Sequence, residues 1–296
     1  MQRVSQQQQT KTRISYSRAL TSAALALGPA WSAAEKGQKR PPSGEYIQIG
    51  GVEAYVAKPK EPSKEAIVIS TDVFGHRLSN VQLIADAFAK DGFLTVVPDM
   101  FNGGALPRWM LDALPKISGI PGDPAGPPSL FSRITTVLSL APFLLWFNIR
   151  NRPGTKVPLL EAVIKEVKEK HGITKVGMIG YCYGGTPIFM IAKKEGVIDT
   201  FVVAHSQVSV PADINTNKVP GLIIAAEADF AFSDKAREQA QEIIEKESLA
   251  DRLRIKYFPG TFHGFAVRGD DKVELIKKAK EEAFHDASQW FKEHLK

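Results

Sequence analysis

The stretch that decides the fold reads Val176-Gly177-Met178-Ile179-Gly180-Tyr181-Cys182-Tyr183-Gly184-Gly185. Its apolar first half predicts a buried strand over 176–180, and the residues after it predict a helix over 186–193. Between them runs G-x-C-x-G, the pattern of a nucleophile elbow with cysteine in place of serine. The glycines are needed because side chains beside the nucleophile would collide with neighbouring backbone. The sequence therefore predicts that Cys182 lies on a sharp strand-to-helix turn.

Cys182 is the only cysteine of the chain, so no intrachain disulfide can form. A lone cysteine is usually a small buried apolar residue. The predicted turn, however, places this one at a helix N-terminus, where the dipole and the free N–H groups favour the thiolate. The N–H of Tyr183 would then point at the oxyanion that forms when a carbonyl is attacked. We therefore expect Cys182 to be a nucleophile.

Strands and helices are predicted to alternate along most of the chain. Gly50-Gly51 predicts a hairpin between strands 45–49 and 52–57. Short apolar runs predict strands that are buried on both faces, and amphipathic spacing predicts helices between them. The further strands are 66–70, 93–97, 176–180, 200–204, 222–226 and 254–258, and the helices are 80–90, 158–170, 186–193, 233–247 and 273–295. This alternation predicts an α/β fold with a mostly parallel sheet and helices on both faces.

A thiolate nucleophile needs a base, and an elbow of this kind is followed along the chain by an acid and then a histidine. Of the six histidines, His263 follows the last predicted strand, where this order puts the base. Glu227 and Asp229 both follow the preceding strand. We prefer Asp229 because it lies further into the loop on a shorter side chain, which leaves Glu227 as a supporting group or a strand-end ion pair. His205 ends a strand, and it either lines the site or packs nearby.

With Cys182, Asp229 and His263 placed, the chain over 45–296 resembles the dienelactone hydrolase family. The matching pieces are the elbow at 180–185 and the stretches 71–75, 97–100, 226–229 and 263–266. The resemblance implies an α/β-hydrolase fold and cleavage of a dienelactone, or a related ester or lactone, through a Cys182-His263-Asp229 triad and an acyl-enzyme. It also implies that no metal or organic cofactor is needed. A general carboxylesterase or thioesterase is one alternative, and a catalytically silent binding protein with the same fold is another.

The same resemblance assigns roles to further residues. Asp72 occupies the place of a family glutamate that contacts the thiol. The Val73 N–H aligns with the second oxyanion donor, beside Tyr183. Family members hold the substrate carboxylate with arginines, for which Arg268 and Arg108 are the candidates here. For Arg268, an ordinary solvated surface arginine is the alternative.

Residues 100–156 interrupt the alternation of strands and helices. They carry many prolines and glycines and an apolar block over 138–149, which contains Pro142. The block is too short to cross a membrane. Three interpretations remain: a lid over the active site, a packing insertion, and an interfacial membrane anchor that gives peripheral contact through 138–149. An apolar insertion also suggests a larger or more lipophilic substrate than a small diacid.

The first 40 residues differ in composition from the rest. They hold seven Lys or Arg and one acid, Glu35, which leaves 31 basic and 31 acidic residues in the hydrolase-like domain over 41–296. A neutral domain argues against nucleic-acid binding. The tail is typical of a mitochondrial presequence, with a secretory signal or a plain disordered tail as alternatives. We expect a cytoplasmic or mitochondrial protein, with secretion as the alternative, that acts as a monomer or homodimer on a small-molecule ester or lactone.

Overall fold

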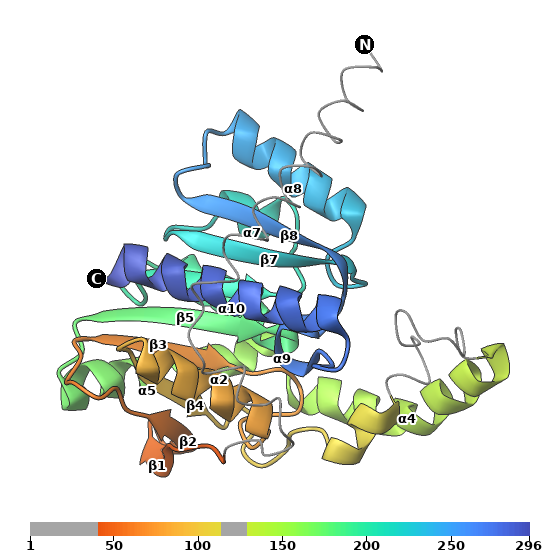
Figure 1. The fold of residues 1–296 in the computed structure, drawn as a ribbon, viewed down its shortest axis with the longest axis horizontal. Coiled ribbons are helices and arrows are strands. Elements are labelled where there is room, and N and C mark those ends of the chain that lie inside the picture. Colours follow the sequence, from red (N-terminus) through yellow and green to blue (C-terminus); the bar gives the residue numbers. More distant parts are fainter. Residues whose placement is uncertain (1–40, 114–128) are drawn as a thin grey trace. The chain divides into compact units, whose positions relative to one another are not determined.

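The computed structural model describes residues 41–113 and 129–296, so the predicted tail over 1–40 lies outside the described residues. Within them, one sheet has the strand order β1-β2-β4-β3-β5-β6-β7-β8 (Figure 1). β2 pairs antiparallel with β1 and β4, and the other neighbouring pairs are parallel. The strands are β1 (Glu45–Ile49), β2 (Val52–Ala57), β3 (Glu65–Ser70), β4 (Leu94–Pro98), β5 (Lys175–Tyr181), β6 (Thr200–Ala204), β7 (Gly221–Ala228) and β8 (Leu253–Phe262).

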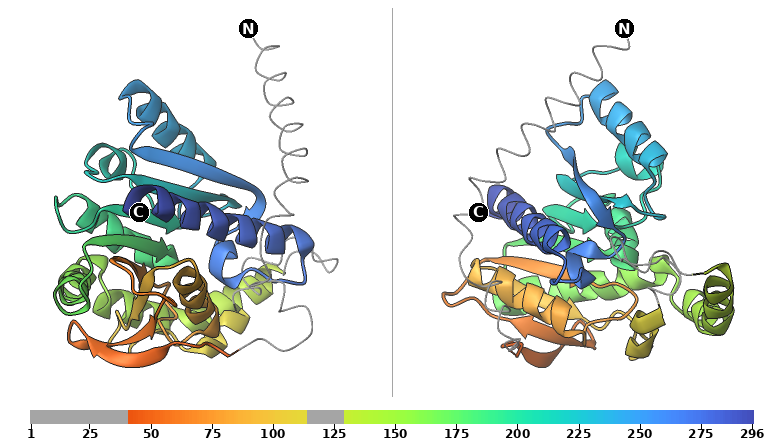
Figure 2. Two further views of the ribbon diagram at one scale, coloured as in Figure 1. Left: turned by 60° about the vertical axis from the view of Figure 1, so that its left-hand side comes forward. Right: turned by 45° about the vertical axis from the view of Figure 1, so that its right-hand side comes forward.

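Helices cover both faces of this sheet, as the two views in Figure 2 show. One face carries α2, α9 and α10, and the other carries α5, α6 and α8. The main helices are α2 (Ser79–Lys90), α4 (Leu130–Arg150), α5 (Val157–His171), α6 (Gly185–Ala192), α8 (Asp234–Lys246), α9 (Phe265–Arg268) and α10 (Glu274–Leu295). The predicted fold class, a mostly parallel sheet with helices on both faces, is confirmed.

The last strand is longer than predicted, and the extra length matters for the site. The sequence indicated a strand over 254–258, whereas β8 continues to Phe262. The extension pairs with the end of β7 after a bulge between Ala226 and Ala228, so that Ala228 lies opposite Phe262. A bulge of this kind twists and bends the strands locally. As a result, the loops that follow β7 and β8 begin side by side.

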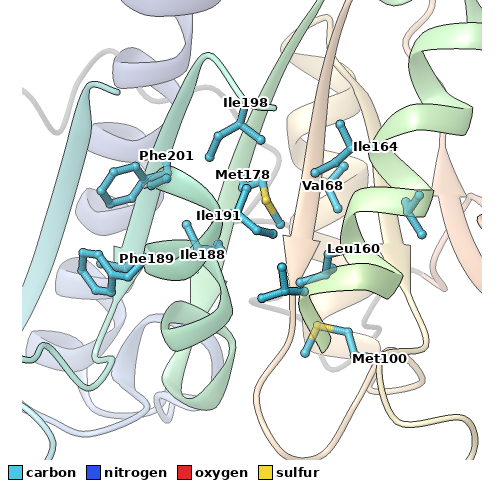
Figure 3. Close-up of a cluster of buried hydrophobic side chains, with 14 of the residues drawn as sticks. Val68, Met100, Leu160, Ile164, Met178, Ile188, Phe189, Ile191, Ile198 and Phe201 are labelled. Atoms are coloured by element: carbon cyan, nitrogen blue, oxygen red, sulfur yellow. The ribbon is translucent and has the colours of Figure 1, made fainter. Parts of the chain in front are cut away.

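The core beneath the predicted elbow is packed between the sheet and two helices. Leu160 and Ile164 of α5 and Ile188 of α6 are buried against Met178 of β5 (Figure 3). α5 has a proline in its first turn and ends at Gly172, whose left-handed φ of 66° closes the helix. Full burial of an aliphatic side chain of this size contributes about 1.5–3 kcal/mol to the free energy of unfolding. Apolar packing therefore fixes β5, and with it the start of the turn at Cys182.

The insertion contains a longer helix than its apolar block suggested. α4 runs through Pro142 without ending there, and its N-cap is Ser129, whose side chain accepts a hydrogen bond from the Ser132 N–H. Only Leu140 and Phe147 of α4 are buried. Among the described residues, α4 is the one helix that is long and apolar enough to cross a membrane by length and composition. The prediction of a lid over the site concerns 114–128 as well, which lie outside the described residues.

Candidate active site

Cys182 follows β5 directly and opens a single helical turn, η4 (Cys182–Gly184), that leads into α6. Its φ of 54° lies in the left-handed region, which is rare for a residue other than glycine. A Cβ atom on Gly180 would lie 2.7 Å from the Gly184 carbonyl oxygen, and one on Gly185 would lie 2.2 Å from the Ser206 hydroxyl. A Cβ atom on Gly184 would lie 2.0 Å from the Ser70 carbonyl oxygen, so close backbone approach requires both glycines of G-x-C-x-G, as the sequence indicated. The thiol is half-buried at the turn.

The thiol lies at one end of a chain of three side chains from three loops. The Nε2 atom of His263 lies 3.0 Å from Cys182 Sγ, and its Nδ1 atom lies 2.9 Å from Asp229 Oδ1. The Ala231 N–H also donates to Asp229 Oδ1, at 2.8 Å, which fixes the carboxylate. His263 follows β8 and Asp229 follows β7, so the paired ends of these strands bring the two residues together. The three residues predicted from the sequence are thus adjacent.

Glu227, the alternative acid, has a different partner. Its Oε2 atom accepts a hydrogen bond from the Gly260 N–H at 2.7 Å, and its side chain is exposed. It therefore ties β7 to β8 and does not orient the imidazole. This contact is a strand-end hydrogen bond, whereas the sequence left open a supporting group of the triad or a strand-end ion pair for Glu227.

The surroundings of His263 favour its protonated form. Burial lowers its pKa, but the hydrogen bonds to Asp229 and Cys182 and the charges of these two groups outweigh burial and raise the pKa to about 9. The Cys182 sulfur lies within hydrogen-bond distance of this ring. The arrangement can therefore hold a thiol and a proton donor within one hydrogen bond of each other.

Two rings flank the imidazole: Phe230, which sequence reasoning missed, and His205, whose role it left open. Phe230 lies 4.4 Å from His263 between ring centroids, and 86% of it is exposed. His205 lies 5.3 Å away at an interplanar angle of 76°, and it is fully buried. Burial and the charges of His263 and Arg268 keep the pKa of His205 well below its ordinary value. His205 therefore packs behind the imidazole as a neutral ring, which decides between the two roles that the sequence left open.

The residues predicted to hold the oxyanion stand at two backbone turns. Tyr183 lies in the first turn of η4, where N–H groups have no acceptor within the helix. Val73 lies in the turn after β3, which the Asp72 side chain closes by accepting a hydrogen bond from the Phe74 N–H at 2.9 Å. The hydroxyl of Tyr183 donates to the Asn151 carbonyl at 2.8 Å, so the elbow is also tied to the chain just after α4. The oxyanion role of both N–H groups stays a prediction.

Asp72 and Arg268 form an ion pair with each other, which the sequence did not indicate. Arg268 Nε donates to Asp72 Oδ2 at 2.9 Å, and the two side chains are 15% and 3% exposed. Arg268 is therefore not an ordinary solvated arginine. A guanidinium has five N–H donors, and this contact uses the one on Nε. The thiol contact predicted for Asp72 and the substrate contact predicted for Arg268 stay predictions.

Arg108 stands apart from these residues. It lies on the short helix η2 (Arg108–Ala113) and its side chain is exposed. Within the described residues it makes no hydrogen bond or ion pair with the triad, Asp72 or Arg268. Its predicted contact with the substrate is therefore without support from the geometry and stays a prediction.

Comparison with known proteins adds evidence from the sequence and from the fold. The family model described as dienelactone hydrolase family matches residues 52–295. The hydrolase tropI of Talaromyces stipitatus is 29% identical, with 86% of this chain and 92% of that protein covered. The hydrolase pyvD of Aspergillus violaceofuscus is 30% identical, with 86% and 91% covered. A candidate dienelactone hydrolase from Klebsiella pneumoniae subsp. pneumoniae has a similar fold, with a TM-score of 0.60 at 15% identity over 85% of this chain and 99% of that one.

Proposed function

The chain belongs to the dienelactone hydrolase family, and from this premise we propose that it hydrolyses a carboxylic ester or lactone with Cys182 as the nucleophile. His263 acts as the general acid and base, and Asp229 orients it. The observation that carries the proposal is the pair of contacts at 3.0 Å and 2.9 Å that joins these three side chains. A cysteine that only packs in the core would not need an imidazole and a carboxylate aligned behind it.

The proposed reaction has two steps. The Cys182 thiolate attacks the carbonyl carbon, and the N–H groups of Tyr183 and Val73 stabilise the oxyanion. The C–O bond breaks, and His263 passes its proton to the leaving oxygen. A water molecule then attacks the thioester while His263 takes one of its protons, and the intermediate releases the acid and the thiol.

Titration of His263 tests the role of Asp229. We expect NMR to show an imidazole midpoint near pH 9 in the native chain. In Asp229→Asn the midpoint should fall by about one unit or more, because a neighbouring carboxylate is lost. A pKa above the ordinary 6.5 means that the protonated ring stabilises the fold at low pH, and that this contribution disappears as the pH rises through about 9. The same midpoint in both proteins would show that Asp229 does not act on the ring.

Arg268 is proposed to hold a carboxylate of the substrate with its remaining N–H groups. Arg268→Lys keeps a positive charge beside the buried Asp72 but loses the planar fork. We expect KM for a lactone that bears a carboxylate to rise about tenfold or more, which corresponds to one charge-assisted hydrogen bond. KM for an uncharged ester is the internal control. Equal changes for both substrates would contradict a specific contact with the carboxylate.

A general esterase or thioesterase that takes a lipophilic acyl group is the second candidate, and α4 favours it. Phe147 of this apolar helix lies 5.8 Å from the ring of Tyr183, next to the nucleophile. Steady-state rates of the purified full chain on a dienelactone and on medium-chain acyl esters distinguish the two candidates. The substrate class with the higher kcat/KM identifies the candidate that applies. Absence of turnover on both, together with a thiol that resists mild alkylation, would favour a silent binding protein and contradict the proposal.

A further inference from the structure

The exposed side of α4 is unusually apolar for a helix at the surface of a protein. Phe131, Leu138, Leu145 and Ile149 are 78%, 67%, 64% and 63% exposed. Their spacing of seven, seven and four places them on one side of the helix. The buried Leu140 and Phe147 are offset by two positions, roughly 200° around the axis, and hence lie on the opposite side. α4 is thus attached to the domain along one side and presents an apolar stripe on the other.

The charges on and beside α4 are all positive. From Ser129 to Lys156 the sequence contains no Asp or Glu, while Arg133, Arg150 and Arg152 are exposed. Within the described part of the chain, none of these arginines pairs with a carboxylate. The half-exposed Trp109 and Trp146 lie on or against the same helix, and Trp109 contacts Phe143 at 5.4 Å between ring centroids. Apolar residues, tryptophans and unpaired arginines together are typical of segments that lie at the interface of an anionic membrane.

We propose that α4 is a membrane-docking helix that binds the surface of a bilayer containing anionic lipids. The stripe enters the boundary between headgroups and acyl chains, and Arg150, which is offset by roughly 100° from Ile149 of the stripe, contacts the headgroup phosphates. The helix lies in the plane of the membrane and does not cross it, because Leu140, Phe147 and the Tyr183 hydrogen bond to Asn151 hold it against the domain. Figure 1 shows α4 extending beyond the sheet, where a flat surface can reach it.

An apolar helix can also serve as a core helix or as a contact between two copies of a chain, but α4 fits both roles less well. The core helix of a soluble protein is mostly buried, whereas 11% of the apolar window of α4 is buried. A two-fold contact between copies of α4 would bring the same surface together on both sides. That contact would bring the positive charges of two helices together without an acid on either helix. An anionic bilayer neutralises this charge.

Vesicle flotation of the purified full chain tests the proposal, and it needs no substrate, so its outcome is independent of the proposed chemistry. The probes are vesicles of phosphatidylcholine alone and with about 30% phosphatidylserine. We expect the protein to float with the anionic vesicles and to bind the neutral ones more weakly. The difference between the two binding constants should shrink about fivefold in Arg150→Gln, and it should change less in Arg133→Gln, whose side chain lies opposite the stripe. Failure to bind either vesicle would overturn the proposal.

A matched pair of leucines controls for the effect of an added charge. Leu145→Asp lies in the stripe, and Leu275→Asp changes a leucine of α10 that is 52% exposed. We expect at least about tenfold weaker binding of anionic vesicles by Leu145→Asp, and binding by Leu275→Asp like that of the native chain, with circular dichroism reporting that both fold. Equal binding by the two variants contradicts docking through α4. A different result would assign the stripe to a contact between two copies of the chain. In that case the native chain would be a dimer that does not bind vesicles, and Leu145→Asp would be a monomer.

Discussion

Cys182→Ala is expected to lower kcat/KM for p-nitrophenyl acetate by at least roughly 10⁴-fold, as removal of a nucleophile does in enzymes of this kind. The thiol is the proposed nucleophile, and His263 and Asp229 lie behind it in line. Without the sulfur, the proposed oxyanion donors and the imidazole would leave only residual catalysis by water. Steady-state rates of the native chain and the variant, measured side by side, give the ratio.

The single cysteine supplies a sharp control for this variant. Because no other thiol exists in the chain, a mild alkylating agent can label only Cys182. We expect one label per native chain, loss of activity in proportion to labelling, and no label on Cys182→Ala. Turnover that survives complete alkylation would place the chemistry at another residue.

Gly184→Ala is expected to have the largest effect on folding of the substitutions considered. A Cβ atom at this position would lie 2.0 Å from the carbonyl oxygen of Ser70 and 2.6 Å from that of Thr71. Both are backbone atoms at the end of β3, so no side chain can turn away to relieve the contact. The elbow and the turn that carries Val73 must move apart, at a cost of roughly 3 kcal/mol or more. Urea unfolding, followed by circular dichroism, measures the loss in the free energy of unfolding.

Gly154→Ala is the matched control for this glycine substitution. The nearest atom to a Cβ at Gly154 is the Met190 sulfur at 4.0 Å, and its φ is not positive. We expect its free energy of unfolding to stay within about 1 kcal/mol of the native value. A Gly184→Ala variant as stable as this control would show that the elbow does not pack against β3 as described.

The fold and the three aligned side chains could be predicted from the sequence because their signals are local. Cys182 is marked by the glycines around it, and alternating apolar runs mark the strands whose ends bring His263 and Asp229 together. Sequence order alone did not decide whether Glu227 or Asp229 orients the histidine, since both follow the same predicted strand. The contact of Glu227 with Gly260 depends on the pairing of β7 and β8 beyond the bulge, which periodicity does not reveal.

Contacts between distant loops could not be predicted in the same way. The ion pair of Asp72 and Arg268 joins residues 196 positions apart, and neither position has a pattern that names its partner. Phe230 lies in the loop after β7 together with another phenylalanine, Phe232, and only the structure shows that the ring of Phe230 contacts His263. The length of α4 could not be predicted either, because a proline usually marks the end of a helix, whereas Pro142 lies inside this one.

The most direct test of the proposed chemistry is to trap the covalent intermediate. The native chain is mixed with p-nitrophenyl acetate, quenched with acid before the steady state, and its peptides are analysed by mass spectrometry. We predict one acetyl group on the peptide that contains Cys182, formed at the rate of the p-nitrophenol burst. An acetyl group on another residue, or turnover with no burst and no acetylated Cys182, would contradict a cysteine nucleophile at the elbow.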